Sequence, residues 1–164
     1  MENHERIHPE PEQSAEQREK PEFVYHGSDQ ADIEEFEPRT RYTPGALQGQ
    51  EMPPAIYAGD DPAYAAAHAF PWGSAEGFNL RYEAGKVVLA VPEQLAHRLE
   101  QKVYIYKLSG DAFEVLPDVA PEGHNFWSKV HTKPVEQPVA FDSVREAIEH
   151  FGGEIRIIPE KTTP

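Results

Sequence analysis

Three short segments carry the side chains most able to bind a flat polar ring. Residues 25–28 read Tyr-His-Gly-Ser, residues 56–60 read Ile-Tyr-Ala-Gly-Asp, and a predicted helix carries Tyr64 and His68. A histidine followed by glycine at a strand end places an imidazole beside backbone that a ligand can approach closely. Aromatic rings from the second strand and the helix could then close the other side by stacking. Together the segments predict a slot for a planar heterocycle that shares the N–H and C=O groups of the glycine.

Each of these residues also has an ordinary structural explanation. His26 fits a hydrogen-bonded histidine at a strand end, Tyr25 and Tyr57 fit core aromatics, and Gly27-Ser28 fits a turn. For any one residue alone, the structural explanation is favoured. Only the ordered combination indicates a binding site.

The combination resembles the NAD-binding half of the ADP-ribosyltransferase fold. The resemblance is closest to the His-Tyr-Glu class, the diphtheria-toxin and poly-ADP-ribose-polymerase type. It rests on His-Gly-Ser after an apolar strand, a long connecting segment, and Ile-Tyr-Ala with an aspartate before an alanine-rich helix. RNA 2′-phosphotransferases share this fold, and small bacterial proteins with a Tyr-His-Gly-Ser motif show similar spacing. The resemblance covers residues 23–70 and is faint beyond them.

This resemblance implies NAD as the ligand and substrate. By it, His26 would hydrogen-bond the nicotinamide ribose, backbone groups of Gly27 would hold the carboxamide, and Ser28 would lie beside the same site. Tyr57 falls on the family's strand tyrosine, so His26 and Tyr57 are the expected catalytic pair. The helix position that stacks on nicotinamide falls on His68 when counted without gaps.

Some assignments stay open. Tyr64 lies one helical turn before His68, on the same helix face, and is an alternative stacking residue. Arg39 or Arg81 could bind pyrophosphate, although such an arginine is more often a surface charge.

The family's third element, a glutamate near the end of the sheet, has no clear match. Glu122, Glu136 and Glu154 are candidates, while residues 125–128 occupy the expected place and offer Asn125 instead of an acid. Asparagine can neither act as a base nor carry the negative charge that favours a developing cation. If Asn125 is the equivalent residue, transfer would be weak or absent.

Three functions follow from the resemblance. The first is an enzyme that cleaves the nicotinamide–ribose bond of NAD and passes ADP-ribose to an unknown acceptor. The second is a catalytically inactive nucleotide-binding or protein-interaction module of the same fold. The third, 2′-phosphotransfer on RNA, would need a basic groove.

Composition narrows the partners and the location. The net charge is −14 and no Lys/Arg cluster is present, so nucleic acid is an unlikely partner. The chain has no cysteine, no His-Glu-x-x-His motif and no glycine-rich phosphate loop, so we expect no metal site and no P-loop or dinucleotide motif. No apolar run approaches the roughly 20 residues that span a membrane, and residues 1–6 lack a signal-peptide pattern. We therefore expect a cytoplasmic protein with no membrane partner.

The periodicity predicts an α+β fold rather than a doubly wound sheet, because strands and helices do not alternate strictly. Residues 1–22 contain seven Glu and three Pro, which predicts a disordered acidic tail before one domain at residues 23–160. By the resemblance, that domain has a split β-sheet core with short flanking helices. Helical segments are expected at residues 31–36, 63–70, 92–101 and 144–151, and loops at 39–54 and 116–133. Asp61-Pro62 predicts the start of the second helix, and Ser143 with Glu146 predicts a capping box for the last. Strands are expected at residues 23–28, 55–58, 86–91, 103–108, 113–116, 135–141 and 154–158.

Overall fold

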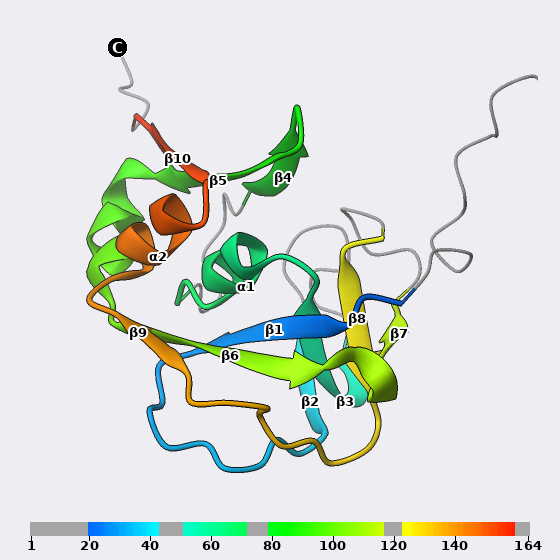
Figure 1. The fold of residues 1–164 in the computed structure, drawn as a ribbon. Coiled ribbons are helices and arrows are strands. Elements are labelled where there is room, and N and C mark those ends of the chain that lie inside the picture. Colours follow the sequence, from blue (N-terminus) through cyan, green and yellow to red (C-terminus); the bar gives the residue numbers. More distant parts are fainter. Residues whose placement is uncertain (1–19, 43–50, 72–78, 117–122, 160–164) are drawn as a thin grey trace, which may run out of the picture.

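The computed structural model describes residues 20–42, 51–71, 79–116 and 123–159. It is an α+β protein with two sheets and short helices, as the sequence predicts (Figure 1). Helix α1 (Pro62–His68) packs on strands of both sheets and lies between them. The other helical elements are α2 (Val144–His150) and the 3₁₀ segments η4 (Glu93–Glu100) and η5 (Gly110–Ala112).

The larger sheet has the strand order β7-β8-β3-β1-β6-β9, and β2 pairs with β3 outside this path. Its strands are β1 (Phe23–Ser28), β2 (Arg39–Tyr42), β3 (Glu51–Gly59), β6 (Val103–Ser109), β7 (Glu114–Val115), β8 (Asn125–Ser128) and β9 (Val139–Phe141). The smaller sheet has the order β10-β5-β4. Its strands are β4 (Asn79–Glu83), β5 (Lys86–Pro92) and β10 (Glu154–Ile158), with β10 parallel to β5.

Local sequence explains why α1 begins where it does and packs so closely. The carboxylate of Asp61 accepts a hydrogen bond from the Ala63 N–H at 2.8 Å, and Pro62 occupies the first turn, where no N–H is needed. The helix is rich in buried alanine, so its backbone approaches β1. A Cβ placed on Gly27 would lie 2.5 Å from the carbonyl oxygen of Ala65. Gly27 therefore faces α1 and leaves no room for a side chain.

The core is divided between the two faces of the larger sheet. Tyr25 of β1 packs into a cluster with α1, α2 and β5, whereas Val24 belongs to a second cluster with Phe36, Ile56 and Tyr106. This division follows from the alternation of side chains along a strand. It determines which predicted site residues can meet.

The structure confirms several predicted elements and differs at others. Helix α2 has the expected capping box, in which the Ser143 hydroxyl accepts from the Glu146 N–H at 3.0 Å and Glu146 accepts from the Asp142 N–H at 3.0 Å. The segment predicted as a helix at residues 92–101 is a 3₁₀ helix over residues 93–100 rather than an α-helix. Residues 31–36 contain bends and, at Phe36, an isolated bridge to Thr132, rather than the expected helical turn.

Two predicted loops contain strands. Strand β2 and the first half of β3 lie within residues 39–54, and β8 lies within residues 116–133. Prolines 53 and 54 are tolerated because this half of β3 pairs with β2 alone, which leaves one side without a ladder.

Most of the predicted tail, residues 1–19, lies outside the described residues. The folded part begins earlier than residue 23, because Lys20 donates to the Asp111 carbonyl at 3.1 Å and Glu22 accepts from the Gly110 N–H at 2.9 Å. Across the described ranges, no helix is long and apolar enough to cross a membrane.

Candidate functional site

Strands β1 and β3 lie side by side but pair at one position only. Tyr25 is in register with Gly59, whereas β1 pairs with β6 along all six residues. Beyond that pair, Nδ1 of His26 lies 2.8 Å from the carbonyl oxygen of Tyr57. A carbonyl only accepts hydrogen bonds, so Nδ1 carries the proton and Nε2 is the acceptor of the neutral ring. The strand geometry thus sets the tautomer and orientation of the His26 imidazole.

The His26 imidazole lies in a cavity of about 530 Å³. Its ring contacts Phe36 edge-on, with the ring centroids 4.9 Å apart. One part of the lining is apolar, and the remainder comes from the segment after β1 and is rich in carboxylates. The described lining residues are His26, Ser28, Asp29, Gln30, Asp32, Ile33, Glu34, Glu35, Phe36, Glu37, Ala55, Ile56 and Tyr57.

Long-range hydrogen bonds hold the cavity wall in place. The Tyr106 hydroxyl donates to the Gln30 carbonyl at 2.6 Å and accepts from the Ile33 N–H at 3.2 Å. Phe36 and Thr132 exchange two backbone hydrogen bonds of 2.7 and 3.1 Å. These tertiary bonds, together with repulsion among the carboxylates of residues 29–37, explain why the segment is not helical.

The six predicted site residues are divided between the two sides of the sheet. His26, Ser28 and Tyr57 line the cavity. Gly27 faces α1 instead. Tyr64 and His68 belong to α1, and neither is among the described residues that line the cavity. The reason is that consecutive residues on β1 point to opposite faces. The structure therefore brings the imidazole beside the backbone of the strand tyrosine and separates the imidazole from the helix rings.

Tyr57 connects the two sides. Its carbonyl holds His26, while its ring lies 6.4 Å from that of Trp127 on the neighbouring β8. Gly59, two residues further along β3, faces Tyr64, because a Cβ on Gly59 would lie 2.7 Å from the Tyr64 ring. Side-chain alternation then places the Tyr57 ring on the α1 face as well.

Asn125, the residue in the place expected for a glutamate, is the first residue of β8 and lies opposite Gly59. Its side-chain oxygen accepts a 2.8 Å hydrogen bond from the Tyr64 hydroxyl, and it is 8% exposed. Among the other candidates, Glu136 is exposed between β8 and β9, and Glu122 lies outside the described residues. Glu154 belongs to the smaller sheet.

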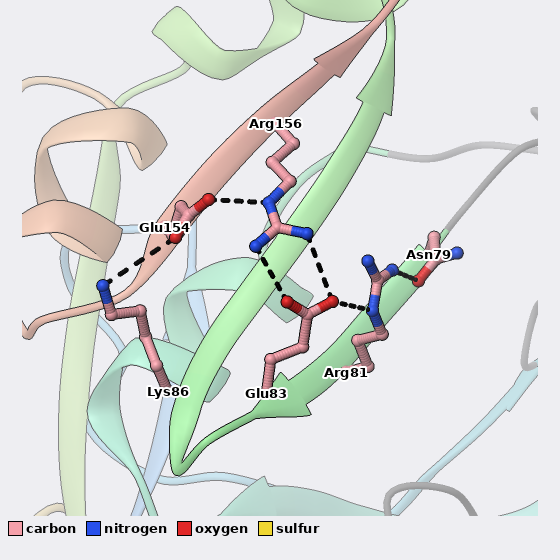
Figure 2. A network of polar contacts seen from close by, with 6 residues as sticks. All are labelled: Asn79, Arg81, Glu83, Lys86, Glu154 and Arg156. Carbon is pink, nitrogen blue, oxygen red and sulfur yellow. Dashed lines mark hydrogen bonds and ion pairs between the residues drawn. The ribbon is translucent and has the colours of Figure 1, made fainter.

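Glu154 and Arg81 both take part in a polar network on that smaller sheet, drawn in Figure 2. Arg81 pairs with Glu83 and bonds Asn79, while Arg156 bonds Glu83 at 2.8 Å and Glu154 at 2.6 Å. These pairs lower the pKa of Glu83, chiefly through Arg156. The guanidinium of Arg81 therefore already contacts Glu83 and Asn79 of its own strand. Arg39 begins β2, opposite Ala55.

Sequence reasoning missed a second polar cluster at the far end of β3. His124 lies 3.0 Å from the Asp60 carboxylate and stacks on Tyr82 with centroids 4.1 Å apart. The Tyr82 hydroxyl donates to Asp61 at 3.2 Å. Burial, and then the negative charges of Asp61 and Asp60, raise the pKa of Tyr82 well above its usual value. No spacing in the sequence links these residues, so only the fold reveals the cluster.

In the parts of the chain that the structure describes, no group of three or more acidic or histidine side chains is arranged to hold a metal ion. Comparison of the chain with models of protein families, with curated proteins and with solved structures found no match in any of the three.

Proposed function

We propose that this chain is an ADP-ribosyltransferase-like protein that binds NAD at the His26 cavity, releases nicotinamide and passes ADP-ribose to an acceptor. The arrangement of the two motif strands supports the proposal. The strand with His-Gly-Ser lies beside the strand with Ile-Tyr-Ala, as that fold requires. The split of the sheet between them is where the imidazole lies.

The observation that carries the proposal is the 2.8 Å hydrogen bond between Nδ1 of His26 and the Tyr57 carbonyl. This bond makes Nε2 an acceptor, which suits a ribose hydroxyl donor. Holding the ribose fixes the anomeric carbon relative to the nicotinamide.

In the proposed reaction, the bond between the anomeric carbon and the pyridinium nitrogen breaks, and its electron pair leaves with neutral nicotinamide. The positive charge passes to the ribose, where an acceptor lone pair then forms the new bond and the acceptor proton goes to solvent. Carboxylates that share the cavity with His26 would stabilise the cationic transition state electrostatically. Acidic side chains at the His26 cavity thus favour an enzyme over a passive binder.

One observation favours the second candidate, a nucleotide-binding module without transfer activity. Asn125 stands where the resemblance expects a glutamate, and its side-chain oxygen is already bonded to Tyr64. The two candidates make the same prediction for binding and different predictions for nicotinamide release.

The test is a calorimetric titration of the full chain with NAD and with nicotinamide. We expect saturable binding that His26→Ala removes, and that His97→Ala leaves unchanged because His97 lies exposed on η4. Urea unfolding of both variants checks folding, since losing the Tyr57 bond costs His26→Ala about 1 kcal/mol. Unchanged NAD affinity in a folded His26→Ala variant would refute the proposal.

Nicotinamide release, followed by chromatography at saturating NAD, then separates enzyme from binder. Release that requires His26 supports the transferase. Binding that requires His26 without any release supports the non-catalytic module.

A further inference from the structure

The His26 cavity has a charge distribution that the proposed function does not by itself require. Five of the residues that line it are carboxylates: Asp29, Asp32, Glu34, Glu35 and Glu37. Among the described lining residues there is no Lys or Arg. Near the cavity, Nδ1 of His131 lies 3.7 Å from the Glu35 carboxylate, and the His131 side chain is 57% exposed.

The electrostatic influence of these carboxylates reaches across the whole cavity. Charges in physiological salt act over about 8 Å. A volume of about 530 Å³ is of similar width, so a ligand anywhere in it lies within reach of several carboxylates. These carboxylates therefore favour a cation over a phosphate.

The apolar wall of the cavity favours an aromatic ring. Phe36 and Ile56 are buried in the second core cluster, and their cavity sides form an apolar wall next to the imidazole. Apolar walls with a few placed polar groups are typical of small-molecule sites. A cation with a flat apolar body satisfies both the wall and the carboxylates.

We propose that the cavity recognises the positive charge of an N-substituted pyridinium carboxamide, and that the diphosphate of a dinucleotide lies outside it. This inference rests on the proposed function and names the feature of the substrate that is selected. The oxidised pyridinium is a cation, whereas the reduced dihydropyridine and free nicotinamide are neutral. The cavity thus holds the substrate ring more tightly than the product ring, and cleavage of the glycosidic bond weakens the hold on nicotinamide.

A second consequence concerns the size of the substrate. Because the diphosphate gains nothing from an acidic rim, a pyridinium nucleoside without phosphate binds at least as tightly as NAD. This order is the reverse of that in a site whose arginines clamp pyrophosphate.

The test compares two small probes, the 1-methylnicotinamide cation and neutral nicotinamide, by calorimetry on the full chain in 50 mM NaCl. We expect the cation to bind about tenfold more tightly, which corresponds to about 1.4 kcal/mol. Replacing two rim acids with Glu34→Gln and Glu37→Gln should reduce the preference to about threefold. The matched control Glu114→Gln, exposed on β7 and outside the cavity, should leave it at tenfold. Raising the NaCl concentration to 500 mM should also reduce the preference for the cation over neutral nicotinamide.

NAD, titrated into the same samples, separates this inference from the proposed function. If NAD and nicotinamide bind through His26 and the cation shows no advantage, the charge inference is overturned and the proposed function stands. If the cation binds with the predicted preference and NAD does not bind, the charge inference stands and NAD is the wrong substrate. If none of the three binds, both are overturned.

Discussion

Single residues decide how closely α1 approaches the sheet, and hence where the candidate site can lie. Gly27 and Gly59 both face the helix at distances that exclude a Cβ. His26, between Tyr25 and Gly27 on the same strand, must then point to the other face. The His-Gly pair therefore separates the imidazole from the helix, which the linear motif does not reveal.

Gly27→Ala tests this close approach. The new methyl group would meet the backbone oxygen of Ala65 at 2.5 Å, and backbone cannot move aside as a flexible side chain can. We expect the free energy of unfolding to fall by about 1–3 kcal/mol, as for other overpacked sites. Urea denaturation measures the change. Ser28→Ala, the next residue on the same strand, serves as the control, and equal stabilities of the two variants would contradict the packing described.

The raised pKa of Tyr82 predicts that the protein loses stability at alkaline pH. Its folded-state pKa is raised above 10 by burial beside Asp61 and Asp60, so the unfolded state loses the phenolic proton first as pH rises. The unfolded state then binds fewer protons, and the free energy of unfolding falls above pH 10 by at most about 1.4 kcal/mol per pH unit. Urea unfolding between pH 9 and 11 measures the slope. Tyr82→Phe should flatten it, and an equal slope in both proteins would show that other groups are responsible.

At the scale of elements, local signals with a direct physical cause predicted structure well. The Asp61-Pro62 start of α1 and the Ser143/Glu146 capping box of α2 could be predicted from the sequence, because a cap depends on neighbouring residues only. Strand β8 was not readable, because Asn125 and Phe126 are both buried and its four residues show no alternation. The bends of residues 29–37 depend on Tyr106 and Thr132, which are remote in sequence.

The α2 cap offers a prediction at this scale. Ser143→Ala removes the acceptor of the Glu146 N–H and should lower the free energy of unfolding by about 1 kcal/mol. Thermal unfolding followed by circular dichroism measures it. Ser143→Asp retains an acceptor and should recover most of the loss, whereas a loss equal to that of the alanine variant would assign the hydroxyl another role.

At the scale of the whole molecule, α1 packs on both sheets, and two of the polar clusters lie at different positions along β3. The His26 cavity lies beside Ala55–Tyr57, and the Asp60–His124 cluster begins directly after Gly59, the last residue of β3. Sequence identified residues of the first site through a motif in two short segments. It could not identify the acidic wall as part of the site, or His124 and Tyr82 as partners, because only the tertiary fold brings them together.

The most direct test of the central claim is a map of backbone amide NMR shifts across the whole chain during a titration with NAD. Binding of NAD at the His26 cavity predicts saturable changes at His26 and Ser28, along residues 29–37 and at residues 55–57, all of which are lost in His26→Ala. Changes centred on Asp60 and His124 with none at the cavity, or no saturable change anywhere, would contradict it.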